Sequence, residues 1–284
     1  MLAQFHELAS DHTSGATEII HRLLAVCESC VIGQAYDVLR EGLALLEQSQ
    51  SNMPSFHATL HILRKEFLPL LRADGDNAVA IGFLTSLKQI LDESAEEISR
   101  SFISLFRTPV RVLTISRSGT VLLALRRLSE LGRLEHLAVL EARPMLEGHK
   151  TLREFNGIAR ASLYVDAAMG EAVTQSNCAV VGADCVSADG FLLNKTGTFP
   201  LALCCRTYGV PLYVLCDSLK FSPQLREQIP VEESPDSDIV TKQKKDTFTV
   251  VNKYFEWTPI DLVTAFVTER GIFTPEKISG IAGE

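Results

Sequence analysis

From residue 108 onward, short apolar runs rich in β-branched residues alternate with stretches of helical periodicity. Each run is apolar on both faces and is followed by Gly, Ser, Asp or Pro, as expected of strands buried on both sides. The runs are residues 110–113, 137–140, 162–165, 179–181 and 212–215. This alternation predicts a Rossmann-like α/β domain with a doubly wound, mostly parallel sheet.

The residues before position 108 show a different pattern of apolar side chains. Apolar side chains recur at helical spacing over 17–31, 36–46, 57–71, 79–90 and 95–106, with no β-alternation between them. We therefore expect a helical N-terminal domain over 1–107 and a Rossmann-like, phosphosugar-binding domain over 108–284. Within the second domain, residues 222–245 predict a surface excursion, 247–251 a last strand and 258–271 a closing helix.

Composition bounds the function. The 284 residues carry a net charge of -8, which argues against direct binding of nucleic acid because a duplex-coating protein needs a basic excess. Apolar runs fall short of the ~18 residues that a membrane span needs, and no basic leader precedes an apolar stretch. Seven scattered cysteines, including a lone Cys27–Cys30 pair, predict free thiols in the cytoplasm and no metal site. We expect no organic cofactor.

Ligands of doubly wound sheets bind beyond the C-terminal ends of the strands, so the residues just after each run matter most. After the first run, Ser116, Arg117, Ser118 and Gly119 lead into a helix, and with Thr114 and Thr120 they could cradle an anion. The alternative is that Ser118 or Thr120 only caps that helix. The loop also looks like the phosphate loop of sugar isomerase domains, which we treat as convergent phosphate chemistry.

The next two runs are also followed by polar groups. Arg143 could bind a phosphate or carboxylate bidentately, or could form a surface salt bridge. Asp166 stands where an Asp often caps a helix. Gly182 and Asp184 follow the fourth run, and a buried carboxylic acid there is a candidate general acid or base.

Further along, Asn194 and Lys195 open a segment, 194–198, that again suits an anion at a helix entry. Asp184 could alternatively cap a helix or bind Lys195. Polar clusters at successive strand ends together predict a small phosphorylated ligand in the crevice of the sheet.

The segments VLTISRSGT, EARPMLEG, VDAAMG, GADCVSADG, NKTGTFPLA and YVLCDSLKF occur in this order. Together they resemble the family of translation initiation factor 2B alpha, beta and delta subunits, which includes methylthioribose-1-phosphate isomerase and ribose-1,5-bisphosphate isomerase. The tail EWTPIDLVTAFVTERGIFTP is similar to the C-terminal signature of that family. The resemblance covers nearly the whole chain and implies a homodimer formed through the C-terminal domain.

The resemblance also implies site residues. In the isomerases a Cys after the first strand and the Asp of a GAD motif convert an aldose phosphate to a ketose. By position the Asp is Asp184, the Asn-Lys pair is Asn194 and Lys195, and the Arg of the family's RP motif is Arg143. The Cys position holds Ser116, whose hydroxyl is far less acidic than a thiol.

Two phosphate-binding arginines of the isomerases also have no counterpart, in the segments 14–16 and 53–55. Arg117 could replace one of them. The resemblance leaves two functions open. One is a sugar-phosphate isomerase-like enzyme with an altered site, in which Asp184 and Ser116 act on a phosphorylated pentose. The other is a non-catalytic regulatory subunit that senses a sugar phosphate or nucleotide.

Overall fold

The computed structural model describes residues 1–11, 14, 16–47, 54–72, 77–229, 231, 235–241 and 247–281. Contacts between residues divide the chain into two compact units, Met1–Ser94 and Ala95–Glu284. The division falls within helix α5 (Ala78–Ser104), upstream of the domain boundary expected after residue 107. That boundary stays a prediction.

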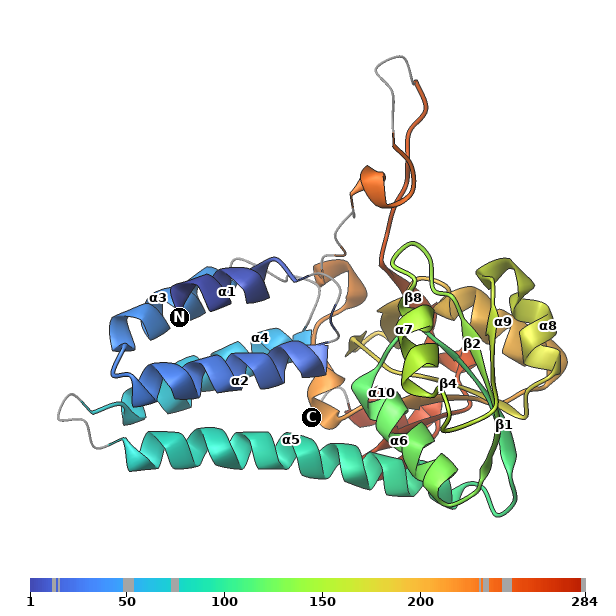
Figure 1. Cartoon of the computed structure of the whole chain (residues 1–284), viewed down its shortest axis with the longest axis horizontal. Coiled ribbons are helices and arrows are strands. Elements are labelled where there is room, and N and C mark those ends of the chain that lie inside the picture. The colour runs from blue at the N-terminus through green and yellow to red at the C-terminus, as the bar shows by residue number, and fades with distance from the viewer. Residues whose placement is uncertain are drawn as a thin grey trace. The chain divides into compact units, whose positions relative to one another are not determined.

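The first unit is built from helices packed side by side (Figure 1). They are α1 (Leu2–Ala9), α2 (Ala16–Ile32), α3 (Tyr36–Glu47), α4 (Pro54–Ile62) and the N-terminal part of α5, with a π-helical turn at Leu63–Phe67 and a 3-10 turn at Leu68–Leu70. The predicted helices are present, except that 79–90 and 95–106 fall mainly in the single helix α5. Neither Gly nor Pro interrupts residues 91–94, so the helix continues. Helix α1 was not predicted.

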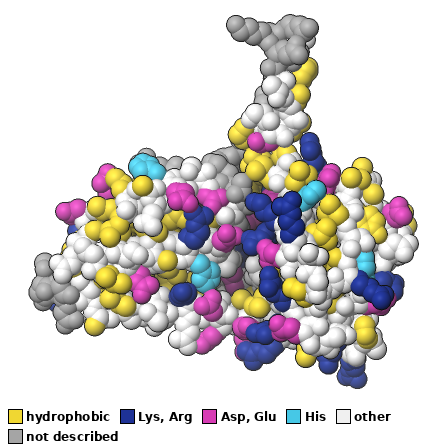
Figure 2. All heavy atoms as spheres, viewed as in Figure 1, with side chains coloured by type: hydrophobic (Ala, Val, Ile, Leu, Met, Phe, Trp, Pro, Cys, Tyr) yellow, Lys and Arg dark blue, Asp and Glu magenta, His cyan; other side chains and the backbone are white. Residues whose placement is uncertain are grey.

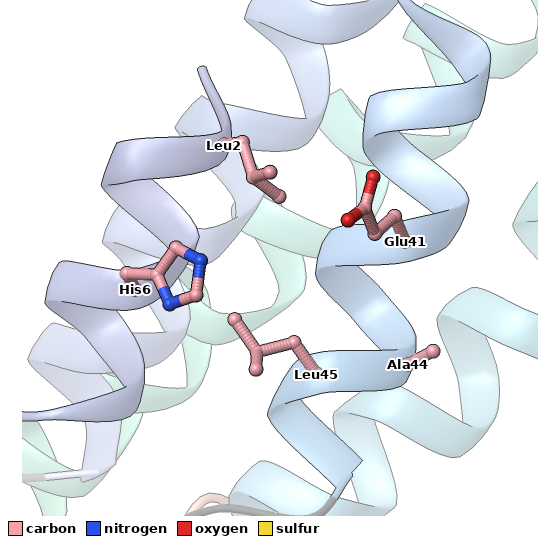
Figure 3. Close-up of a pocket in the computed structure, with 5 residues that line it drawn as sticks. All are labelled: Leu2, His6, Glu41, Ala44 and Leu45. Carbon is pink, nitrogen blue, oxygen red and sulfur yellow. The ribbon is translucent and has the colours of Figure 1, made fainter.

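Helices α1 and α3 pack closely because Gly42 presents no side chain to Phe5. A Cβ at position 42 would lie 2.4 Å from the Phe5 ring. The outer surface of this pair carries a hollow of about 220 Å³, lined by Leu2, His6, Glu41, Ala44 and Leu45 (Figure 3). Apolar side chains form most of this lining, and we assign it no chemistry.

The second unit contains the predicted doubly wound sheet. Its seven strands lie in the order β10-β9-β7-β4-β1-β2-β3, all parallel except that β10 is antiparallel to β9. Each of the five predicted runs lies in or overlaps a strand. The strands are β1 (Val110–Ile115), β2 (Leu134–Leu140), β3 (Ala161–Tyr164), β4 (Cys178–Val181), β7 (Leu212–Leu215), β9 (Ala265–Thr268) and β10 (Gly271–Phe273).

Alternate residues of each central strand enter different apolar cores. In β1, Leu113 and Ile115 belong to one core, and Val110 and Val112 belong to the other. Helices α8 (Met169–Thr174) and α9 (Thr198–Tyr208) cover the first face. Helix α6 (Gly119–Glu130) and the end of α5 cover the second (Figure 1). Burial on both faces explains why the strands are continuous apolar runs.

A second, antiparallel sheet was not predicted. It has the order β5-β6-β8 and consists of β5 (Cys185–Val186), β6 (Phe191–Lys195) and β8 (Phe255–Pro259). Strands β5 and β6 lie within the segment from Asp184 to Lys195, and the amide of Asp184 donates to the carbonyl of Leu193 at 2.9 Å.

Two predictions near the C-terminus are wrong. Residues 247–251 form no strand, and 258–271 form no helix. The latter segment contains the end of β8, a 3-10 turn at Ile260–Leu262, β9 and the first residue of β10, and the closing helix is α10 (Pro275–Ile281). A strand buried on both faces has no period-2 pattern, so its apolar residues are easily mistaken for a buried helix.

The expected surface excursion, 222–245, includes 3-10 turns at Arg226–Gln228 and Asp236–Asp238, and parts of it lie outside the described residues. Within the described part of the chain, no helix is long and apolar enough to cross a membrane. Acidic and basic side chains are interspersed over the face seen in Figure 2.

Candidate functional site

The direction in which strands are added to the main sheet reverses beside β1. The chain runs outward from β1 through β2 to β3, then crosses back to β4 on the other side of β1. Doubly wound sheets bind their ligands at such a reversal, beyond the C-terminal ends of the strands. Ser116, Arg117 and Ser118 follow β1, and Asp184 follows β4.

Three glycines allow the loops at this edge to approach one another. A Cβ at Gly182 would lie 2.7 Å from Ser118 Oγ, so the loops after β4 and β1 touch. A Cβ at Gly197 would lie 2.5 Å from Ile115 Cδ1, and Gly197 has φ +107°, which also favours glycine. A Cβ at Gly148 would lie 2.0 Å from the carbonyl oxygen of Leu140, so α7 (Glu147–Glu154) begins directly against the end of β2.

The loop after β1 turns sharply. Ser116 has φ +66°, a left-handed conformation that non-glycine residues seldom adopt, and its carbonyl accepts a hydrogen bond of 3.0 Å from Thr151 Oγ1. Ser118 Oγ accepts from the amide of Val121 at 3.5 Å, so the capping role of Ser118 is confirmed. Gly119 is the first residue of α6, and no atom outside its own helix and chain neighbours would lie within 4 Å of an added Cβ. The anion cradle stays a prediction.

Arg117 lies against helix α7. Its Nε donates to Glu154 Oε1 at 2.9 Å, while Arg126 donates to Glu154 Oε2 at the same distance. The Arg117 side chain is 31% exposed. In this arrangement, Arg117 would have to bind a ligand phosphate while its Nε remains hydrogen-bonded to Glu154.

The loop after β2 is fixed by Asp166. Its carboxylate accepts from the amides of Ala142 and Arg143 at 3.0 and 2.8 Å, and it makes no cap to its own 3-10 turn. The capping role considered for Asp166 is therefore wrong, because the carboxylate joins two loops instead. The Arg143 side chain is exposed and forms no ion pair with any described residue, so the surface salt bridge is not found either.

A buried charged cluster lies at the same edge. It consists of Glu147, Asp184, Lys195 and Lys220, which are 3%, 9%, 5% and 4% exposed. Lys195 Nζ lies 2.5 Å from Glu147 Oε1. Burial raises the pKa of Asp184 and Glu147 adds to this, while the ammonium groups of Lys220 and Lys195 oppose it. The raised pKa favours the protonated form of Asp184 relative to a free carboxyl group, as a general acid requires.

Lys195 is held by aromatic rings as well as by Glu147. Its Nζ lies 5.1 Å from the ring centroid of Tyr254 and 5.3 Å from that of Phe255. Phe255 pairs with Lys195 across β6 and β8. Lys195 therefore forms its ion pair with Glu147, whereas its interaction with Asp184 is a longer-range electrostatic one.

The entry of α9 differs from expectation. Asn194 and Lys195 end strand β6, and Asn194 Nδ2 donates to Thr198 Oγ1 at 2.9 Å. The amides of Gly197 and Phe199 donate to Glu256 Oε1 at 2.7 and 2.9 Å. The anion predicted at this helix entry is thus supplied by the chain itself.

Sequence reasoning missed Glu147, Lys220 and Glu256. Glu147 and Lys220 also follow strands of the sheet, and that position was the available signal. The charge of Lys220 acts on Asp184, and the neighbouring Phe221 forms a parallel bridge with Val186, two residues beyond Asp184. Of the segments in which isomerase arginines have no counterpart, Gly15 and Met53 lie outside the described residues. Among the residues that the structure describes, no three His, Cys, Asp or Glu side chains gather as a metal site would require.

The model of the initiation factor 2 subunit family matches residues 12–275. Ribose 1,5-bisphosphate isomerase of Archaeoglobus fulgidus is 32% identical over 58% of this chain and 54% of its own length. Methylthioribose-1-phosphate isomerase of Drosophila persimilis is 33% identical over 60% and 52%. A putative translation initiation factor eIF-2B subunit 2-like protein of Pyrococcus horikoshii is 29% identical over 83% and 82%. The matches therefore span about half the length of the two isomerases.

Solved structures share the fold. The 5-methylthioribose 1-phosphate isomerase of Pyrococcus horikoshii OT3 matches with a TM-score of 0.82 at 19% identity, over 99% of this chain and 87% of that one. The translation initiation factor eIF-2B of the same organism matches with a TM-score of 0.76 at 23% identity, over 97% of each chain. At these identities the likeness concerns the fold alone. Since the family model matches nearly the whole sequence, the chain belongs to the initiation factor 2 subunit family.

Proposed function

We propose that this protein binds a phosphorylated pentose beyond the C-terminal ends of β1 and β4 and acts on it as an aldose–ketose isomerase-like enzyme with an altered site. One observation carries the proposal: Asp184 is buried at the topological switch point, burial raises its pKa, and the charges of two buried ammonium groups act on it. Relatives named as sugar-phosphate isomerases support the substrate class.

In this proposal Asp184 accepts and returns the proton that an aldose–ketose interconversion moves, with no net gain or loss of atoms. Ser116 stands beside the reacting carbons and contributes a hydroxyl for hydrogen bonding, because it is too weak an acid to replace a thiol. Lys195 and Asn194 line the sugar side of the site. Ligand phosphate would be bound by Arg143, Arg117 and the loop Ser118–Gly119.

The second candidate is a regulatory subunit that binds a sugar phosphate or nucleotide without turning it over. It is favoured by Ser116 in the position of the catalytic Cys. It is also favoured by the longer match to the eIF-2B subunit 2-like protein, which covers 82% of that protein. Substitution of Asp184 distinguishes the two functions, because an enzyme needs this residue to transfer a proton and a protein that only binds the ligand does not.

The test is a thermal-shift panel of ribose 1-phosphate, ribose 1,5-bisphosphate, methylthioribose 1-phosphate, AMP and GDP. A ligand at 100 times its Kd stabilises the native state by about 2.7 kcal/mol, or roughly 5–10 °C for a unit of this size. The enzyme function predicts that the stabilising phosphosugar is turned over and that Asp184→Asn abolishes turnover. Binding without turnover, unchanged in Asp184→Asn, would favour the regulatory subunit.

Arg117 is tested in the same panel. Arg117→Ala should weaken phosphosugar binding if the guanidinium replaces a lost phosphate arginine. Arg126→Ala is the matched control, because Arg126 contacts the other oxygen of the same Glu154 carboxylate. If the parent and Arg117→Ala bound the phosphosugar equally well, Arg117 would not be part of the binding site.

We further propose that the protein forms a homodimer through the second unit, that it does not bind nucleic acid directly and that it acts in the cytoplasm. Phe199 and Leu203 lie one turn apart on α9 and are 36% and 43% exposed, as an apolar interface requires. Leu203→Glu should then shift the mass measured by light scattering to that of a monomer. An unchanged dimer mass would exclude this face.

A further inference from the structure

Glu147 is a buried carboxylate that the proposed chemistry does not use. It is the first residue of α7 and only 3% exposed. Its Oε1 binds Lys195 Nζ at 2.5 Å. Its Oε2 is buried and has no hydrogen-bond partner among the residues that the structure describes.

An orphaned carboxylate oxygen in this position is costly. Buried polar atoms are nearly always hydrogen-bonded, and a charged group without its full set of partners loses solvation that the interior does not return. The backbone gives Glu147 little freedom to move away, because the adjacent Gly148 lies so close to β2 that a Cβ there would be 2.0 Å from the carbonyl oxygen of Leu140. The burial of Glu147 is therefore imposed by the packing of α7 on the end of β2.

This oxygen belongs to the buried charged cluster around Asp184. The charge of Glu147 is felt by Asp184, and both carboxylates share the ammonium of Lys195 as a neighbour. A carboxylate only accepts hydrogen bonds and repels a phosphate. The missing partner must then be a donor, and the donors of a phosphosugar are its hydroxyl groups.

We propose that Glu147 Oε2 accepts a hydrogen bond from one hydroxyl of the sugar and so selects the hydroxyl pattern of the ligand. This inference rests on the proposed function. It divides the site into a carboxylate-lined part for the sugar, formed by Glu147 and Asp184, and an arginine and hydroxyl part for the phosphate. The role is one of substrate specificity and requires no proton transfer by Glu147.

The experiment is titration calorimetry with ribose 1-phosphate, its 2-deoxy, 3-deoxy and 5-deoxy analogues, and inorganic phosphate. Glu147→Gln should weaken ribose 1-phosphate about 10- to 100-fold, the usual effect of a hydrogen bond to a charged group. One deoxy analogue should bind the parent and the variant equally, and inorganic phosphate should not distinguish them.

The matched control is Glu154→Gln. Glu154 lies on the same helix, but both of its oxygens are bound by arginines, so its neutralisation should not alter discrimination among the deoxy analogues. If Glu147→Gln does not fold, Glu147→Asp keeps the negative charge beside Lys195 but draws the carboxylate back by one methylene, and it permits the same comparison.

The outcomes separate the two proposals. If the parent binds none of these phosphosugars, the proposed function fails and this inference fails with it. If the parent binds ribose 1-phosphate, and Glu147→Gln binds every analogue as the parent does or weakens all of them equally, only the role of Glu147 is refuted. In that case its carboxylate serves only to neutralise Lys195.

Discussion

Replacing Gly148 by alanine would place a methyl group where the backbone of β2 already lies. A Cβ at this position would be 2.0 Å from the carbonyl oxygen of Leu140 and 3.0 Å from the Cα of Glu141. Carbon and carbonyl oxygen ordinarily approach no closer than about 3.3 Å, so α7 would have to move by more than about 1 Å. Because the contact is with backbone, no side-chain rotation can relieve it.

The magnitude follows from two opposing terms. Overpacking costs about 1–3 kcal/mol, and a backbone contact this short belongs at the upper end. Alanine recovers about 1 kcal/mol of helix propensity relative to glycine. The net loss of about 2 kcal/mol corresponds to a melting temperature lower by roughly 4–8 °C for a unit of this size.

The assay is thermal unfolding followed by circular dichroism, with Gly170→Ala as the control. Gly170 is the second residue of α8 as Gly148 is of α7, but its added Cβ would find its nearest atom 4.0 Å away on Tyr208. The control should therefore match or exceed the parent in stability. If Gly148→Ala melted at or above the temperature of the parent, the contact between α7 and β2 would not be as close as described.

Three further perturbations test the charged residues around the site. Lys195→Met strands the buried carboxylate of Glu147 and should cost about 3–5 kcal/mol in urea unfolding, so unchanged stability would contradict the buried pair. Because burial raises the pKa of Asp184, its protonated form stabilises the fold below the unfolded pKa of about 4, and this contribution is lost as pH rises through the folded pKa. The melting temperature of Asp184→Asn minus that of the parent should therefore rise between pH 4 and pH 8. A difference that stayed constant over this range would refute the raised pKa. Glu256→Ala frees two amides at the start of α9 and should lower stability by about 1–2 kcal/mol, measured by thermal unfolding, whereas no loss would mean that water replaces the carboxylate fully.

Sequence patterns predicted the main sheet because its central strands are buried on both faces. The run Leu212–Leu215 became a strand with the predicted bounds. The same property misled the assignment of residues 258–271, where an apolar stretch became β9 and β10 instead of a helix. Local periodicity cannot distinguish a short buried strand from a buried helix, and only pairing with β7 settles it.

The position of Asp184 after a buried strand could be predicted for a similar reason, since strand ends are visible in the sequence and parallel strands end at one edge. The charged residues that surround Asp184 in the folded protein could not be predicted in this way. Glu147 and Lys220 appear in the sequence as ordinary charged residues, which are usually exposed. Their burial arises from the contact of α7 with β2 and from the bridge between Phe221 and Val186.

The sequence by itself therefore determined the family and the α/β class, and it predicted the edge of the sheet at which a ligand should bind. These depend on local patterns of apolar and polar residues, which each segment carries alone. The tertiary structure decided which charged groups are buried together. It pairs Lys195 with Glu147, and it places the carboxylate of Glu256 where it accepts hydrogen bonds from amides at the start of α9. Such pairings join segments far apart in the chain, and the energy of a buried charge depends on the partners that folding brings within a few ångströms.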